Sequence, residues 1–213
     1  MYREHVVEWI KQYKIIAIIK GVGSLYVENT VKALCDGGIR VVEFTLNSAD
    51  ALKSITIARE TMLGKMVCGA GTVMTDETVD DAAVAGAQFI SCIHSDARII
   101  TKISEMDKAI IAGACTPTDI VTAKEHGADF INIFPSITLG SDYFKQIKSP
   151  FSEEFFFAIG GINTENAAGF LKAGAGGIGI GNNLVNPRFI KEDNYNAIKE
   201  EAAKYVKIVK AFV

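Results

Sequence analysis

The stretch GGIRVVEFT at residues 37–45 contains the pattern that decides the fold: a helix-ending glycine, a short link and then an apolar strand. The same order of residue types returns at 85–91, 126–133 and 173–180. The glycine at the second position of each copy, which is Gly38, Gly86, Gly127 or Gly174, recurs at intervals of 41 to 48 residues. A strand and its following helix occupy about half such an interval, so each interval holds two strand–helix units.

Four further short apolar segments fall between these copies and predict the remaining strands. They lie at Ile15–Lys20, Met66–Ala70, Ala109–Ala112 and Phe155–Ile159. Eight alternating strands and helices predict an α/β protein with a parallel sheet covered by helices, and a closed (β/α)8 barrel is the solution that we favour. An open, doubly wound sheet is the alternative.

Signals for the helices complete this pattern. We expect an extra N-terminal helix at Tyr2–Tyr13 and a last helix at Asn194–Phe212. Thr116 is placed to cap a helix, and Thr75-Asp76-Glu77 puts acids in the first turn of another. The sequence from Asn163 caps a further helix that is expected to run to Ala173. No linker or low-complexity segment interrupts the chain, so residues 1–213 are expected to form a single barrel domain.

The composition narrows the range of partners. The chain has 213 residues, 22 Lys and Arg against 25 Asp and Glu, and a formal charge of −3, so there is no basic field for nucleic acid. No apolar run approaches the roughly 20 residues that span a bilayer, and the mixed N-terminal segment does not predict a signal peptide. The four cysteines lack CxxC spacing, which favours reduced thiols in a cytoplasmic protein.

In such a barrel the chemistry lies where the strands end at their carboxyl side. Glycine-rich loops follow the predicted seventh and eighth strands, at Gly160-Gly161 and at Gly181-Asn182. Main-chain N–H groups in loops of this kind can bind a phosphate. Tight turns between strands and helices are the alternative explanation.

Glu43 is the most informative single residue, because an acid among Val42 and Phe44 is costly to bury. Burial raises a carboxyl pKa toward the range of a general base. A structural ion pair between Glu43 and Lys20 is the alternative. Lys20 itself ends the first strand, where it is suited to bind a carboxylate or, less simply, to form an imine.

Three other residues at strand ends are candidates for substrate contact. Thr72 could orient a substrate oxygen or cap the next helix, and Cys92 could be a nucleophile, although an inert core thiol is the more common role. His94 could carry protons or simply be exposed to solvent. Only Glu43 and His94 offer themselves as metal ligands, so no metal site is expected.

Motifs spread in order over nearly the whole chain resemble those of the 2-keto-3-deoxy-6-phosphogluconate/4-hydroxy-2-oxoglutarate (KDPG/KHG) aldolase family. They are Val42–Leu46, Gly69–Val73, Ala85–Phe89, Gly113–Thr118, Phe134-Pro135 and Gly160–Ile162. The resemblance implies a barrel that is usually a homotrimer and needs no metal or other cofactor. It also implies cleavage of a 2-keto-4-hydroxy acid, here expected to be phosphorylated, to pyruvate and an aldehyde.

The resemblance assigns roles to individual positions. Glu43 matches the acid/base glutamate and Thr72 the substrate-contacting threonine, while Lys20 falls where the family has a basic residue. Phe134 belongs to the Phe-Pro motif and is expected to contact the substrate. The phosphate-binding loops correspond to Gly160, Gly161, Gly181 and Asn182, although Gly181-Asn182-Asn183 replaces the usual Gly-Gly-Ser.

Three positions depart from the family pattern. Asn132 replaces the lysine of the sixth strand that forms the imine in the family. The amide nitrogen of Asn132 is not nucleophilic, and the amide can only take part in hydrogen bonds. Asn47 replaces the arginine that the family has after the second strand, which weakens carboxylate binding. Cys92 replaces the proline that the family has after the serine of the fourth strand.

These departures leave three hypotheses. In the first, the chain is an aldolase with altered catalysis, for which Lys20 is the one lysine expected at the mouth. In the second, it enolises or isomerises a phosphorylated keto acid through Glu43 together with His94 or Cys92. In the third, it binds such a ligand without turnover. A fold alone does not choose among them.

Overall fold

The computed structural model describes residues 2–212, which form a closed barrel of eight parallel strands in sequential order. The strands are β1 (Ile15–Ile19), β2 (Val41–Thr45), β3 (Val67–Val73), β4 (Phe89–Cys92), β5 (Ala109–Ala114), β6 (Phe130–Ile133), β7 (Phe156–Ile159) and β8 (Gly177–Ile180). The pairing of β1 with β8 closes the barrel and excludes the open sheet.

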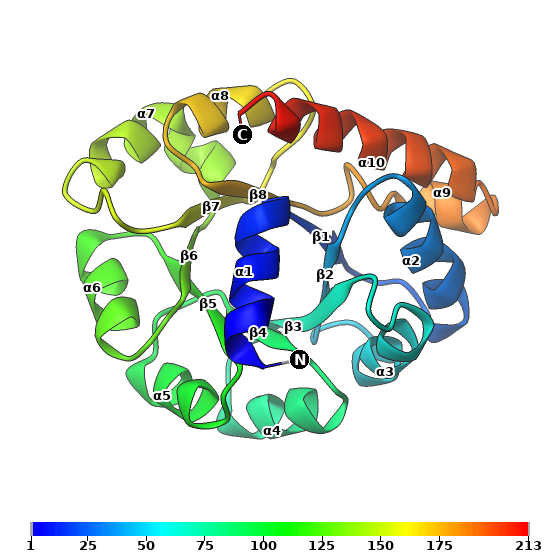
Figure 1. The fold of residues 1–213 in the computed structure, drawn as a ribbon, viewed down its shortest axis with the longest axis horizontal. Helices are drawn as coiled ribbons and strands as arrows, with labels where there is room; N and C mark the ends of the chain where they lie inside the picture. The colour runs from blue at the N-terminus through cyan, green and yellow to red at the C-terminus, as the bar shows by residue number, and fades with distance from the viewer. Residues whose placement is uncertain (1, 213) are drawn as a thin grey trace.

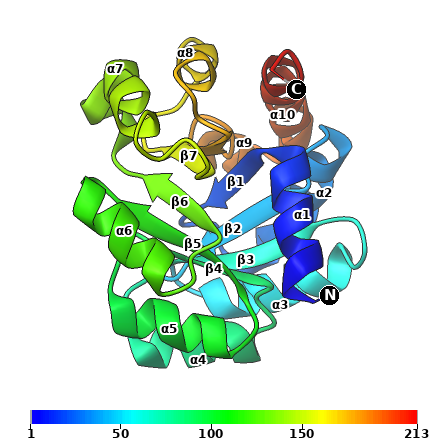
Figure 2. The same ribbon diagram turned by 60° about the vertical axis from the view of Figure 1, so that its left-hand side comes forward.

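Helices alternate with the strands and surround them (Figure 1). They are α1 (Arg3–Tyr13), the short 3-10 helix η1 (Ser24–Tyr26), α2 (Val27–Asp36), α3 (Ala51–Thr61), α4 (Asp76–Val84), α5 (Ala97–Glu105), α6 (Pro117–Glu125), α7 (Ser136–Lys148), α8 (Ala167–Lys172), α9 (Pro187–Lys191) and α10 (Tyr195–Lys210). The extra N-terminal helix is therefore confirmed, and Figure 2 shows the outer helices enclosing the strands.

Local sequence signals explain most of the helix ends. The hydroxyls of Thr75 and Thr116 accept hydrogen bonds from main-chain N–H groups in the first turns of α4 and α6. The cap at Thr116 confirms the prediction, whereas the cap at Thr75 was not predicted. The repeated glycines adopt left-handed φ values between 93° and 105° after α2, α4, α6 and α8. They are Gly38, Gly86, Gly127 and Gly174.

Two predicted boundaries differ from the structure by at least three residues. The helix expected from Asn163 begins only at Ala167, because the Asn163 side chain accepts hydrogen bonds from the N–H groups of Glu165 and Asn166 and holds a turn there. Strand β3 continues to Val73, beyond the expected end at Ala70, because the short residues Gly69, Ala70 and Gly71 remain in register with β2.

The wall of the barrel separates two apolar regions. The outward side chains of the strands pack against the helices in one continuous core. The inward side chains meet Val6 and Ile10 of α1, which lies across one end of the barrel in Figure 1. Helix α1 therefore closes the amino-terminal end of the strands and leaves the carboxyl-terminal end open.

Candidate active site

Three polar side chains point into the barrel from alternate strands near the open end. Glu43 lies on β2, Ser91 on β4 and Asn132 on β6, and all three are at most 4% exposed. Each stands two residues beyond an apolar residue that also points inward, namely Val41, Phe89 or Phe130. They form one layer of the kind in which alternate strands of a barrel supply the side chains.

A cavity of about 300 Å³ opens above this layer. It is lined by Ile18, Lys20, Glu43, Thr45, Asn47, Thr72, Ser91, Ile93, Asn132, Phe134 and Ile159. The structure thus brings together six residues singled out from the sequence: Lys20, Glu43, Asn47, Thr72, Asn132 and Phe134. Ser91 and Thr45 were missed, although a two-residue alternation counted from Phe89 and from Glu43 points to both.

Glu43 is the central ionisable group of the cavity. Its burial raises its pKa from 4.5 to about 7, and a hydrogen bond with Ser91 opposes that rise. Its Oε2 atom is buried and has no hydrogen-bond partner within residues 2–212. A carboxyl group of this kind is close to half-ionised at neutral pH, which suits transfer of a proton in either direction.

The expected alternative for Glu43, an ion pair with Lys20, does not occur. Neither residue takes part in any salt bridge of the described chain. Lys20 is exposed at the rim of the cavity, while Glu43 lies buried deeper in it. The charge of Lys20 is therefore free to meet an anionic ligand.

Gly71 makes room for the carboxyl group of Glu43. A Cβ atom at this position would lie 1.8 Å from Oε1 and 2.3 Å from Cδ of Glu43. A side chain here would therefore displace the carboxyl group. The close approach of Glu43 therefore requires glycine at position 71, which is the second glycine of the Gly-Ala-Gly-Thr motif.

Asn132 is the second residue of the cavity with a buried polar atom that lacks a partner. It is 3% exposed, its Oδ1 atom has no hydrogen-bond partner among residues 2–212, and it lies opposite Gly113 on β5 and Phe157 on β7. Buried polar atoms are normally paired. Asn132 and Glu43 line one cavity, and each carries a buried polar atom without a partner. This combination indicates a binding site for a ligand.

Thr72 has a strained backbone at the edge of the cavity. Its φ of 59° is left-handed, which is unfavourable for a β-branched residue. The alternative role as a helix cap is wrong, because the cap of α4 is Thr75. Thr72 lines the cavity in this conformation, and strained residues of this kind cluster at functional sites.

The two glycine-rich loops lie beside this cavity. Gly160 and Gly161 have φ values of 97° and 78°, and a Cβ at Gly160 would lie 3.0 Å from the ring of Phe134. The Asn183 amide donates to the carbonyl of Ile162 over 2.7 Å and so ties the loops together. Within residues 2–212, the N–H groups of Gly161 and Asn182 have no recorded acceptor, so they are available to an anion.

Cys92 and His94 lie away from the centre of the cavity. Cys92 points outward from β4 into the core beneath the helices, because its neighbour Ser91 points inward, and burial raises the pKa of its thiol to about 12. His94 is half-buried rather than exposed, and its Nδ1 atom has no partner in the described chain. Neither residue lines the cavity; Ile93 does.

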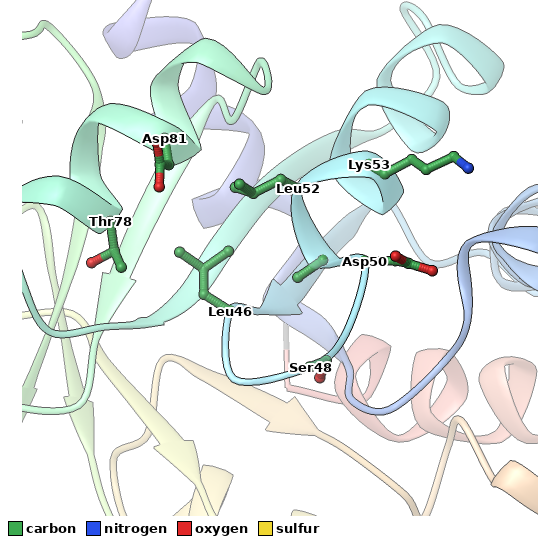
Figure 3. Close-up of a pocket in the computed structure, with 8 residues that line it drawn as sticks. Leu46, Ser48, Asp50, Leu52, Lys53, Thr78 and Asp81 are labelled. Atoms are coloured by element: carbon green, nitrogen blue, oxygen red, sulfur yellow. The ribbon is translucent and has the colours of Figure 1, made fainter.

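A second hollow lies outside the barrel between α3 and α4 (Figure 3). Leu46, Leu52, Asp50 and Asp81 are among the residues that line it. None of its lining residues carries a buried polar atom without a partner. The cavity at the barrel mouth, where two such atoms lie, is therefore the candidate active site.

Residues 2–212 contain no cluster of three or more His, Cys, Asp and Glu side chains suited to hold a metal ion. No helix among them is both long and apolar enough to cross a bilayer.

Comparison with known proteins gives a consistent result. A family model described as KDPG and KHG aldolase matches residues 6–201. The chain is 31% identical over 201 residues to 2-dehydro-3-deoxy-6-phosphogalactonate aldolase of Escherichia coli (strain K12), covering 94% of this chain and 96% of that protein.

Solved structures agree with the sequence comparison. One described as "Native KDPGal structure" matches with a TM-score of 0.87 and 32% identity over 93% of this chain and 95% of the other. KDPG aldolase from Legionella pneumophila, with pyruvate captured as a covalent carbinolamine intermediate, matches with a TM-score of 0.85 and 25% identity over 92% and 96% of the two chains.

Proposed function

The chain belongs to the KDPG and KHG aldolase family, and on that premise we propose that it is a carbon–carbon lyase for a small 2-keto-4-hydroxy acid. The products would be pyruvate and an aldehyde. The observation that carries this proposal is the buried Glu43 carboxyl, with one unpartnered oxygen at the floor of the mouth cavity and a pKa of about 7.

Glu43 would move the proton of the cleavage reaction. Its carboxylate takes the proton of the C4 hydroxyl, the bond between C3 and C4 breaks, and the electron pair moves into the C2 carbonyl group. The carboxylic acid then returns the proton to C3, which completes pyruvate and restores the carboxylate. The near-neutral pKa of Glu43 suits both halves of this cycle.

The rim of the cavity is suited to bind a substrate that carries a negative charge at each of its two ends. Lys20, Asn47 and Thr72 offer a positive charge and hydrogen bonds to the 2-keto acid end. The loops at Gly160-Gly161 and Gly181-Asn182 offer main-chain N–H groups to a phosphate. The relatives named as phosphogalactonate and phosphogluconate aldolases support a six-carbon sugar acid phosphate as the substrate.

Asn132 favours a second candidate function. Because an amide cannot form an imine, the usual covalent route is missing at this position, and Lys20 is the lysine that lines the cavity. The same Glu43 could then enolise a phosphorylated keto acid without cleaving it, or the barrel could bind the ligand without turnover.

Pyruvate release tests these alternatives. We would mix the protein with 2-dehydro-3-deoxy-6-phosphogalactonate, 2-dehydro-3-deoxy-6-phosphogluconate and 4-hydroxy-2-oxoglutarate and couple pyruvate formation to lactate dehydrogenase. Cleavage of one of them, with kcat about 10²- to 10⁴-fold lower in Glu43→Gln, is the expected result. Exposed Glu60 supplies the matched control Glu60→Gln.

A failure of this assay would also be informative. Thermal stabilisation by the phosphorylated compounds without pyruvate release would contradict the lyase proposal and support a binder. Loss of C3 protons to deuterated solvent without cleavage would instead support enolisation.

The remaining proposals concern organisation. We propose that residues 1–213 act as one domain, that three copies assemble as in the family pattern, and that the protein is cytoplasmic. The four free cysteines suit a reducing compartment. Light scattering coupled to size exclusion would test the trimer against the mass of 23.0 kDa for one chain.

A further inference from the structure

We infer that the side-chain amide of Asn132 stabilises the enolate oxygen of a bound 2-keto acid through a hydrogen bond, so that the reaction proceeds without a covalent imine. This inference rests on the proposed function, because it takes the 2-keto acid and the role of Glu43 from it. It adds a catalytic role for a residue that cannot act as a nucleophile.

The amide of Asn132 is unused by the protein. No hydrogen bond of its side chain is recorded within residues 2–212, although the residue is 3% exposed and its Oδ1 atom is fully buried. An unpaired amide in a barrel interior is unfavourable. Hydrogen-bond donors held in place and shielded from water are what a developing oxyanion requires.

The barrel places this amide across the cavity from Glu43. In a closed barrel of eight strands, β2 and β6 are separated by three strands on either side and therefore face each other. Both residues belong to the same inward layer and line the same cavity of about 300 Å³. A keto acid between them has its C3–C4 side toward Glu43 when its keto oxygen is toward Asn132.

The side chains around Asn132 favour a hydrogen bond to the substrate over a covalent bond. Ser91, on the strand midway between β2 and β6, bonds to Glu43, and the remaining wall includes Ile18, Phe134 and Ile159. An apolar wall strengthens the bond between an amide N–H and an oxyanion. Lys20 lies at the exposed rim, where it suits the substrate carboxylate.

The proposed step balances without any additional reactant. Glu43 removes a proton, from C3 of pyruvate or from the C4 hydroxyl of the longer acid. With pyruvate, the electron pair of the C3–H bond forms the double bond between C2 and C3. With the longer acid, the pair of the O–H bond forms the carbonyl group of the aldehyde, the C3–C4 bond breaks, and its electron pair forms the double bond between C2 and C3. In both cases the carbonyl pair of C2 moves to its oxygen, which accepts a hydrogen bond from Asn132. Protonation of C3 by Glu43 then regenerates pyruvate in the first case and yields pyruvate as a product in the second.

Exchange of the methyl protons of pyruvate in deuterated water tests this step directly. We expect the protein to catalyse the exchange, followed by ¹H NMR, and Asn132→Leu to slow it about 10²- to 10³-fold, the usual effect of removing one oxyanion donor. The dissociation constant for pyruvate should change much less. Asn196 is an exposed asparagine on α10, so Asn196→Leu serves as the control.

Reduction by borohydride separates this route from an imine. Intact-mass analysis after pyruvate and borohydride should show no adduct on the native protein. Asn132→Lys, which puts an amine at the same place, should become trappable, and this gain would show that pyruvate reaches residue 132. An adduct on the native protein that disappears in Lys20→Ala would overturn the inference.

The outcomes distinguish the inference from the function on which it rests. Exchange that depends on Glu43 and Asn132, with no sugar acid cleaved, would support the inference and reject the lyase. Cleavage through a trapped imine would support the lyase and reject the inference. Absence of exchange in the native protein, or exchange that is unchanged in Asn132→Leu, would also reject it.

Discussion

The two ends of the barrel interior are built from the same eight strands but differ in chemistry. At the closed end, Phe89, Phe130 and Phe157 fill the interior beneath α1, and a Cβ at Gly69 would lie only 2.4 Å from the ring of Phe89. At the open end, two residues further along β2, β4 and β6, the inward positions hold Glu43, Ser91 and Asn132.

The difference shows how one barrel separates stability from function. Apolar packing at the closed end contributes to folding, whereas buried polar atoms without partners at the open end reduce it. Such a cost is expected where a ligand completes the missing contacts. The following predictions change one end while leaving the other intact.

The largest effect is expected from filling the space beside Glu43. Gly71→Ala would place a methyl group on the Glu43 carboxyl and displace it, so kcat should fall between about 10² and 10⁴-fold. Steady-state assays of the folded variant would measure this loss. Gly169→Ala is the matched control, since a Cβ there meets nothing within 4 Å; equal losses in both variants would contradict the proposed fit.

A second prediction concerns the closed end alone. Phe130→Ala should lower the free energy of unfolding by about 3–5 kcal/mol, because it leaves a cavity among Phe155 and Phe157. Urea unfolding measures the change. The pyruvate dissociation constant of the folded variant should be retained, and Leu25→Ala, at a position 88% exposed, should leave stability almost unchanged.

The pKa of Glu43 predicts how stability depends on pH. Because burial raises this pKa from 4.5 to about 7, the folded state holds a proton that the unfolded state has released between those values. Stability should therefore fall as the pH rises from 4.5 to about 7, by about 3 kcal/mol. Unfolding of the protein and of Glu43→Gln across this range measures the effect, and an identical slope in both would contradict the assignment.

The smallest effect on stability among these core and cavity changes is expected at Asn132. Asn132→Leu replaces an unpaired amide with an apolar group of similar size, so the free energy of unfolding should rise by about 1 kcal/mol. Thermal or urea unfolding measures the gain. A loss of stability would indicate that the amide has a structural partner and would weaken the contrast between the two ends.

Much of the fold was predictable because the repeated glycine–strand pattern is local. Left-handed glycines end helices for reasons of backbone sterics alone, and threonine caps depend on residues three positions apart. The start of the helix after Asn163 was predicted wrongly, since the side chain of that residue could stabilise either a cap or a turn.

The candidate site was predictable in part. Glu43 and Lys20 stood out as charges at strand ends, and both line the cavity. Ser91 was missed in favour of Cys92, because the orientation of β4 depends on which residue starts the inward alternation. The strained backbone of Thr72 and the absence of a bond between Glu43 and Lys20 have no signal in the sequence.

The sequence by itself determined the alternation of strands and helices, the family and the presence of an amide at position 132, because each of these is a matter of residue identity and spacing. Only the tertiary structure decided that Glu43 and Asn132, 89 positions apart in the chain, are buried in one cavity. The raised pKa of Glu43 and the unpaired amide of Asn132 follow from that burial, since the cost of desolvation depends on what surrounds a group.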